Sequence, residues 1–203
     1  MTHRLYRGDL PDTVAFGDAV AIDTEAMGLN PHRDRLCLVQ LSAGDGDAHL
    51  VQLAAGCYGA PNLRRLLADH RVLKLFHFAR FDIAILYHYL GVMPQPLYCT
   101  KIASRLARTF TDKHGLRDLC KDLLGIDLKK EHQSSDWGNA QLTEEQLRYA
   151  ASDVLHLHAL RARLDDMLRR ERRSELAQSC FDFLPARALL DLAGWAEQDI
   201  FAH

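Results

Sequence analysis

The sequence predicts an α/β layer architecture. In the first half of the chain, strand-like apolar runs alternate with helical patterns, whereas the second half is mostly helical. The length of 203 residues suits one domain with a well-buried core, and a hydrophobic content of 48% is ordinary for a globular protein. We find no internal repeat and no low-complexity linker, so we expect a single domain over residues 1–203.

Short apolar runs predict the strands of the first half, at residues 20–22, 36–41, 49–53 and 72–76. The second and third of these runs flank the turn-like sequence GDGD, which favours an antiparallel hairpin. Helical patterns occupy residues 61–69 and 81–90. We expect the second helix to be amphipathic and to end at Gly91 and Pro94.

The second half of the chain is dominated by helical patterns. Apolar residues at helical spacing predict helices over residues 100–107 and 116–124. The sequence from Thr143 to Gln146 forms a capping box, so a further helix should begin there, and we expect it to run to about Arg170. The tail, residues 174–203, carries large apolar side chains in patches. These patches predict a segment that docks on the protein or lies at an oligomer interface.

The charge balance shows no overall basic character. The net charge is −2 and the pI is about 6.6, whereas proteins that grip long nucleic acids usually carry a basic face. Between Lys101 and Lys130 basic residues outnumber acids. Either a local basic surface or a set of solvated helix faces explains this stretch.

Targeting signals and cysteine pairs are both missing from the sequence pattern. No apolar run is long enough to span a membrane, and the N-terminus lacks the apolar core of a signal peptide. We therefore expect a cytoplasmic protein without membrane contact. The five cysteines are widely spaced, odd in number and contain no C-x-x-C pair, which argues against a disulfide framework and a structural zinc site.

Two acids, Asp23 and Glu25, follow the first predicted strand directly. Side chains two residues apart on a strand point to the same side, so both carboxylates should share one face while Thr24 points to the other. A D-x-E pattern on its own is a weak signal, because it also occurs at solvated strand ends.

The acids that come later in the chain can also be explained either as site residues or as surface residues. Tyr149 and Asp153 are four residues apart on a predicted helix and should share one of its faces. The small side chains of Ala150 and Ala151 lie between them and would allow a close approach to a neighbouring element. Asp82 precedes an apolar helical run, where a first-turn acid interacts favourably with the helix dipole. Taken singly, each acid is better explained as a surface or half-buried structural residue.

The order of these motifs carries more information than any one of them. D-x-E, then FDIAIL, then Y-x-x-x-D resembles the DEDD exonuclease superfamily, in particular the branch with a tyrosine in the last motif, which includes ribonuclease D and polymerase proofreading domains. LVQLS and QSSDW extend the resemblance. Over its whole length, through segments such as GLNPHRDRLCLVQLS, KLFHFARFDIAIL and GWAEQDIFAH, the chain is most similar to the nanoRNase C family, short ribonuclease D-like proteins of alphaproteobacteria that degrade dinucleotides.

The resemblance implies a ribonuclease H-like mixed sheet flanked by helices, the DEDD exonuclease domain. It implies that Asp23, Glu25, Asp82 and Asp153 hold two divalent cations, Mg²⁺ or Mn²⁺, which are hard ions that prefer oxygen ligands. Tyr149 would orient the attacking water or help to remove its proton, and orientation is favoured because a free tyrosine is a poor base near neutral pH. The reaction would be 3′–5′ hydrolysis to nucleoside 5′-monophosphates, carried out by a homo-oligomer, expected to be a ring-like homo-octamer.

The expected substrate is short RNA, most simply a dinucleotide. Ribonuclease D proteins usually carry helical nucleic-acid-binding domains after the nuclease domain, for which this chain has no room, and the mild charge argues against tracking a long polyanion. Leu29 is expected to wedge between two bases. The remaining candidate substrate contacts, including a 5′-phosphate cap drawn from the last five residues, are Thr24, His77, Arg80, Lys101, Ser104, Arg108, Gln133 and Ser135.

Several alternatives stay open. His77 and Arg80 would either contact a substrate phosphate or serve packing and solvation. A broader 3′–5′ exonuclease acting on longer RNA or on DNA fits the same acids, because nothing in the sequence reports on recognition of the 2′-hydroxyl. A non-catalytic RNA-binding domain is less favoured, since all four acids and Tyr149 are present.

Overall fold

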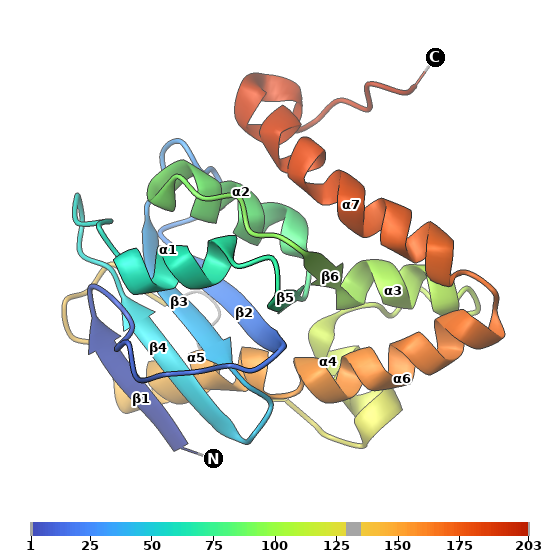
Figure 1. The fold of residues 1–203 in the computed structure, drawn as a ribbon, viewed down its shortest axis with the longest axis horizontal. Helices are drawn as coiled ribbons and strands as arrows, with labels where there is room; N and C mark the ends of the chain where they lie inside the picture. Colours follow the sequence, from blue (N-terminus) through green and yellow to red (C-terminus); the bar gives the residue numbers. More distant parts are fainter. Residues whose placement is uncertain (1, 129–134, 203) are drawn as a thin grey trace.

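A six-stranded mixed sheet forms the centre of the fold (Figure 1). The computed structural model describes residues 2–128 and 135–202. The strand order is β1-β4-β3-β2-β5-β6. Strands β2, β3 and β4 pair antiparallel, while β1 pairs parallel with β4, β5 with β2, and β6 with β5. The strands span β1 Thr2–Arg7, β2 Ala19–Ala26, β3 Leu36–Ser42, β4 Asp47–Gln52, β5 Leu73–Phe76 and β6 Leu97–Cys99.

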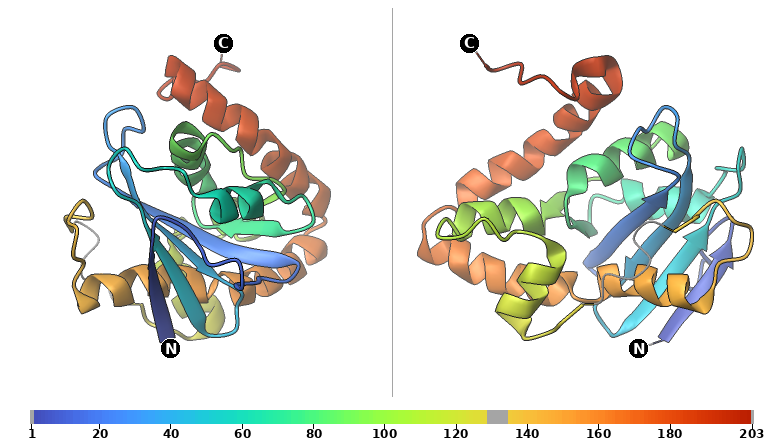
Figure 2. Two further views of the ribbon diagram at one scale, coloured as in Figure 1. Left: turned by 60° about the vertical axis from the view of Figure 1, so that its left-hand side comes forward. Right: turned by 180° about the vertical axis from the view of Figure 1, so that it is seen from behind.

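Helices cover both faces of this sheet. Helices α1 and α2 lie on one face and α5 on the other, and α3, α4, α6 and α7 extend the molecule beyond β6 (Figures 1 and 2). This arrangement confirms the predicted mixed sheet flanked by helices. The helical elements span α1 Pro61–Ala68, α2 Ala79–Leu90, α3 Thr100–Ala107, α4 Leu116–Leu119, the π-helical turn η1 Cys120–Leu124, α5 Glu144–Leu155, α6 Leu157–Arg170, α7 Ser174–Leu190 and the π-helical turn η2 Asp191–Trp195.

Most predicted elements form close to their expected bounds. The β3–β4 hairpin turns through Gly44, whose φ of +82° favours glycine and whose Cα faces the His158 ring too closely for a larger residue. The capping box at the start of α5 forms in full, because the Thr143 hydroxyl accepts from the Gln146 N–H and the Gln146 side chain accepts from the Thr143 N–H.

The predicted long helix over residues 144–170 is wrong in one respect: it is two helices. The chain leaves helical geometry at His156, with φ −107° and ψ −4°, between α5 and α6. Helix α5 packs on the sheet, whereas α6 packs mainly on α3, so the chain must change direction between them. No glycine or proline marks this position, so the sequence pattern alone could not reveal the break.

The other differences concern the sheet and α2. The acids Asp23 and Glu25 lie inside β2 instead of after its end. Helix α2 is buried on most of its circumference and is not amphipathic, because it is packed between the sheet and α7. Strands β1 and β6 lack a clear sequence signal, since β1 is largely exposed at the sheet edge and β6 has only 3 residues.

Burial of one lysine fixes the connection between α1 and β5. Lys74 is fully buried, and its Nζ donates to the carbonyl oxygens of Asp69 and Gln95 at 2.5 and 2.6 Å. Burial lowers the pKa of Lys74 to about 8. The two carbonyl contacts offset part of the cost of burying this ammonium group.

Among the helices that the structure describes, none combines the length and the apolar character needed to cross a bilayer.

Candidate active site

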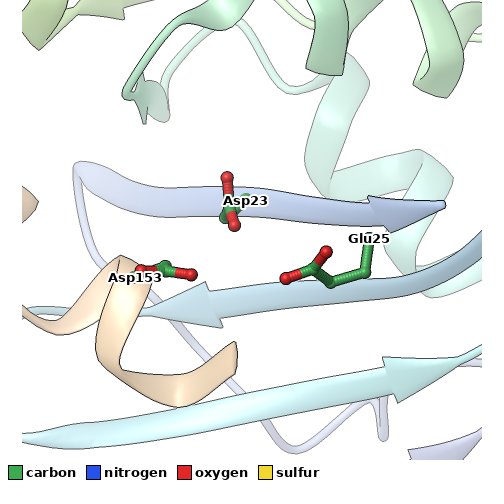
Figure 3. Close-up of side chains that lie close together, drawn as sticks. All are labelled: Asp23, Glu25 and Asp153. Carbon is green, nitrogen blue, oxygen red and sulfur yellow. The ribbon is translucent and has the colours of Figure 1, made fainter. Parts of the chain in front are cut away.

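Three carboxylates meet where α5 packs against β2 (Figure 3). Asp23 and Glu25 point from the same face of β2, as the two-residue repeat of a strand requires, and Asp153 approaches from α5. One oxygen of each of the three carboxylates lies within 4.8 Å of the others. Three acids that the sequence separates by up to 130 residues therefore form one cluster.

The close approach of α5 to the sheet depends on small side chains. Ala150 and Ala151 are fully buried, and α5 contacts β2, β3 and β4. A larger side chain at either alanine would push the helix away from the sheet. This packing agrees with the prediction that the two alanines allow the helix to approach a neighbouring element closely.

Burial and mutual repulsion make the cluster electrostatically unfavourable when it is ionised. Burial raises the pKa of Asp23 to about 7. The pKa of Glu25 is raised by burial and by the charges of Asp23, Asp153 and Asp82, and the pKa of Asp153 by burial and Asp23. A site of this kind takes up protons or cations. Because all of its donors are carboxylate oxygens, the set suits a hard divalent cation such as Mg²⁺ or Mn²⁺.

The fourth acid, Asp82, lies beside this cluster and outside the 4.8 Å group. It is 5% exposed in the first turn of α2, and its Oδ1 accepts a 2.6 Å hydrogen bond from the Thr24 hydroxyl. Burial and the charge of Asp23 raise the pKa of Asp82, whereas the Thr24 bond opposes that rise. The strand thus holds two acids on one side and, through Thr24, a third acid on the other.

Tyr149 stands one turn before Asp153 on α5 and is half-buried. Burial, followed by the charges of Asp153, Glu25 and Asp23, raises its pKa. A tyrosine in this environment stays protonated near neutral pH, and its hydroxyl interacts as a hydrogen-bond donor with the Asp153 carboxylate. The role that we predicted for Tyr149, which is to orient a water molecule, stays a prediction.

The candidate substrate contacts are scattered. Leu29, in the loop after β2, is 85% exposed, and the Lys101 ammonium lies 4.2 Å from the centroid of the Phe78 ring. His77 bonds to the Thr100 hydroxyl through Nδ1 at 2.9 Å, and burial lowers its pKa to about 3. Ser135 is half-buried, and Gln133 falls outside the described residues.

Three candidates already have partners within the protein; Ser104 and Arg108 are buried, whereas Arg80 is partly exposed. Ser104 is fully buried and bonds to His114, and Arg108 is 3% exposed and pairs with Asp122 at 2.5 Å. Arg80 pairs with Asp191 at 2.5 Å. Their burial and existing partners count against a phosphate cap made by Ser104 and Arg108, and they favour the packing interpretation of Arg80.

Two neighbours of the cluster were not among the predicted site residues. Gln40 is fully buried opposite Asp23 in the β2–β3 ladder, and its amide atoms have no hydrogen-bond partner within residues 2–128 and 135–202. Trp137 is 3% exposed and packs against Tyr149. In the sequence, two features could have pointed to these residues: a glutamine inside an apolar strand and a tryptophan in a polar segment.

Comparisons with known proteins agree with this geometry. A family model described as 3′-5′ exonuclease matches residues 9–169. The chain is 40% identical to ribonuclease D of Granulibacter bethesdensis over 76% of this chain and 38% of that protein. It spans between 38% and 53% of the first three curated relatives that it matches.

Solved structures match over the full chain. Brucella melitensis NrnC with bound Mg²⁺ is 56% identical, with a TM-score of 0.96 and coverage of 100% of both chains. Brucella melitensis NrnC bound to pGG is 57% identical, with a TM-score of 0.97 and coverage of 100% of this chain and 99% of that one.

Proposed function

This chain belongs to the 3′-5′ exonuclease family, and from that premise we propose that it hydrolyses short RNA from the 3′ end, with dinucleotides as its main substrate. The observation that carries the proposal is the cluster of Asp23, Glu25 and Asp153, with Asp82 and Tyr149 beside it. The products are nucleoside 5′-monophosphates.

The four acids would hold two divalent cations, Mg²⁺ or Mn²⁺. A bound pair of cations supplies an acidified water and neutralises charge on the leaving oxygen. The raised pKa values of the acids fit this role, because a cation replaces the protons that the crowded carboxylates otherwise retain. The relative from Brucella melitensis, recorded with bound Mg²⁺, supports the assignment.

The protein's own side chains position the reactants. The protonated hydroxyl of Tyr149 donates a hydrogen bond to the attacking water and holds it in line with the bond that breaks. The water oxygen bonds to phosphorus and gives up a proton, the bond from phosphorus to the 3′-oxygen breaks, and that oxygen takes up a proton. Thr24 holds Asp82 at the edge of the site through its 2.6 Å bond.

Three observations support a short substrate. The Brucella melitensis relative bound to pGG covers the whole of this chain at 57% identity. Leu29 is 85% exposed directly after β2, which is a suitable position for an apolar side chain that separates two bases. The net charge of −2 offers little general attraction to a long polyanion.

A second candidate, a broader exonuclease on longer RNA or on DNA, is favoured by the relatives named ribonuclease D. That activity would have to come from the part of those proteins that this chain matches. A third hypothesis is a domain that binds RNA without cleaving it. The clustered acids disfavour this hypothesis, because such a domain has no need of a crowded carboxylate site.

We also propose self-association, as a homo-octamer. Large apolar side chains are exposed on α7 and the segment after it, where a second copy could cover them: Phe183, Leu189, Trp195, Ile200 and Phe201. Light scattering on the intact chain and on a chain lacking residues 195–203 tests this. An unchanged mass after the deletion would count against the interface.

A time course on 5′-phosphorylated RNA of two to seven nucleotides, with matched DNA, tests the function. It is run with Mg²⁺, with Mn²⁺ and with chelator, beside Asp23→Ala. We expect strong preference for the two-nucleotide RNA, loss of cleavage with chelator and loss in the variant. Comparable rates at all lengths would favour the broader exonuclease, and chelator-resistant cleavage would refute the two-cation reading.

A further inference from the structure

We propose that Trp137 is a positioning residue that holds the ring of Tyr149 in its reactive orientation. The inference rests on the proposed function, because it concerns the tyrosine that orients the attacking water. Trp137 lies between η1 and α5, outside the three elements that carry the acids (β2, α2 and α5), and was not among the predicted site residues.

The two rings are in direct aromatic contact. Their centroids are 6.2 Å apart and their planes are tilted by 36°. Trp137 is 3% exposed and Tyr149 is half-buried, so the indole covers part of the tyrosine that solvent would otherwise reach. The Trp137 Nε1 atom is buried and has no partner within residues 2–128 and 135–202. The indole is thus held by packing, and its effect on Tyr149 is steric.

The segment that carries Trp137 is fastened to the strands of the sheet. Arg35, just before β3, donates to the Gly138 carbonyl at 2.9 Å, and Gln52 of β4 donates to the Asn139 carbonyl at 2.9 Å. These are contacts to backbone atoms on the C-terminal side of Trp137. The indole therefore belongs to a segment that is hydrogen-bonded to residues of the same sheet that carries Asp23 and Glu25.

The same segment is also fastened to the helix of the tyrosine. Gln146 Nε2 donates to the Asp136 carbonyl at 3.3 Å, and Gln146 stands three residues before Tyr149 on α5. On a helix, residues three apart lie on neighbouring positions of one face. Sheet, segment and helix thus form one frame in which the indole and the phenol keep a fixed relation.

This frame matters because Tyr149 acts at the end of a long side chain. Rotation about its side-chain torsions would move the hydroxyl away from the water that it orients. A displacement of about 1 Å in a catalytic group can cost about 100-fold in rate. The indole blocks one direction of that rotation, which a smaller side chain at residue 137 would leave open.

A double-mutant cycle tests the inference. The variants are Trp137→Ala, Tyr149→Phe and the pair together, with Trp137→Phe as a conservative replacement. We expect Trp137→Ala to lower kcat by about 10- to 100-fold with little change in KM or Mg²⁺ affinity, and Trp137→Phe to restore most of the rate. In the Tyr149→Phe background, we expect Trp137→Ala to cost less than about 3-fold, because the two residues act as a unit.

Phe181→Ala is the matched control. Phe181 is also 3% exposed and packs on an aromatic neighbour, Tyr98, at a centroid distance of 4.7 Å, but it lies on α7. Any general loss of stability from removing a buried ring should appear here too, and should be the same with and without Tyr149→Phe. If Trp137→Ala behaved like this control, with effects that multiply in the double variant, the positioning role would be overturned.

A readout that does not depend on activity separates this inference from the proposed function. The six tyrosines are labelled as 3-fluorotyrosine, and the Tyr149 signal is identified by its absence in Tyr149→Phe. We expect Trp137→Ala, but not Phe181→Ala, to shift or broaden that ¹⁹F signal. An unchanged signal would overturn the inference even in an active enzyme. A wild-type protein that cleaves no RNA would refute the proposed function and leave the ring contact to be judged by the spectrum.

Discussion

Thr24 and Asp82 are joined by a buried 2.6 Å hydrogen bond, although 58 residues separate them in the chain. The bond links the central strand β2 to the first turn of α2. It shows that the residue between the two acids of the D-x-E motif has a structural task. Thr24 uses its side chain to hold another acid of the site, and its contact with RNA stays a prediction.

We predict that Thr24→Val weakens the enzyme through Asp82. The valine keeps the shape of the side chain but removes the donor, which leaves a buried carboxylate short of a partner and costs about 1–3 kcal/mol of stability. Mg²⁺ affinity or activity should fall by about 10- to 100-fold, as is usual when a partner of a metal ligand is lost. Isothermal titration with Mg²⁺ and single-turnover cleavage measure both effects.

Thr24→Ser is the control for this substitution, since it retains a hydroxyl at the same position. It should keep most of the Mg²⁺ affinity. A valine variant that bound Mg²⁺ and cleaved RNA like the wild type would show that the hydrogen bond to Asp82 is not needed for either activity.

The carboxylate cluster predicts an unusual pH dependence of stability in the cation-free protein. The folded-state pKa of Asp23 is raised to about 7 from an ordinary value of 3.8, and those of Glu25, Asp82 and Asp153 are raised as well. A raised folded-state pKa gives stability that is complete below the unfolded pKa and is lost as pH rises through the folded pKa. The free energy of unfolding in chelator should therefore fall as the pH rises from about 4 to above 7.

Thermal unfolding with chelator and with Mg²⁺ checks this dependence. Mg²⁺ should raise the melting temperature much more at pH 8 than at pH 5, because at pH 8 it relieves repulsion between ionised acids. At pH 8 in chelator, Asp23→Asn should melt about 5 °C or more above the wild type, since it removes one of the crowded charges. A wild-type protein whose stability in chelator rose from pH 5 to pH 8 while Asp23→Asn did not differ would contradict the electrostatic account.

The parts of the site that follow from local geometry could be predicted from the sequence. Strand periodicity correctly placed Asp23 and Glu25 on one face, and helix periodicity placed Tyr149 one turn from Asp153. The capping box located the start of α5 to the residue. Each of these relations lies within a single element, where spacing along the chain determines direction in space.

Relations between elements could not be predicted in this way. Ser104 and Arg108 were predicted as candidate substrate contacts, but they turn inward on α3 and at its C-cap, where Ser104 bonds to His114 and Arg108 pairs with Asp122. The contact of Trp137 with Tyr149 depends on how the segment before α5 folds back over it. A buried polar group and an exposed one look alike in a sequence, because the partner that decides between them lies elsewhere in the chain.

We predict that Arg80 supports the C-terminal segment and does not bind substrate. Its guanidinium pairs with Asp191 at 2.5 Å and donates to the Ala196 carbonyl at 2.6 Å, and Arg187 shares the same aspartate. Arg80→Ala and Asp191→Ala should each cost about 1–3 kcal/mol and expose residues near 196 to protease. Limited proteolysis and urea unfolding measure these losses.

The comparison between the two variants separates support from substrate binding. A supporting pair predicts that both variants change kcat/KM for a dinucleotide to a similar, small extent. A fall in kcat/KM confined to Arg80→Ala, with Asp191→Ala left active, would instead place Arg80 on a substrate phosphate.

Leu29 provides the sharpest test of how a short substrate is recognised. Its side chain is 85% exposed, so Leu29→Ala removes almost no packing and should leave the melting temperature unchanged. If the side chain separates two bases, the substrate buries it, and KM for a dinucleotide should rise by about 10-fold, the equivalent of losing roughly 1–2 kcal/mol of apolar burial. Phe110→Ala is the matched control, because Phe110 is 77% exposed in the loop after α3.

The length series makes this test specific to recognition. A wedge acts on the two nucleotides in the site, so Leu29→Ala should weaken the preference for two-nucleotide RNA over seven-nucleotide RNA, whereas Phe110→Ala should leave the ratio as it is. If both variants kept the wild-type ratio and KM, the exposed leucine would have no part in selecting the substrate. Specificity would then have to come from elsewhere around the cluster of Asp23, Glu25 and Asp153, since the cations that these acids would hold act on the phosphodiester that every RNA presents.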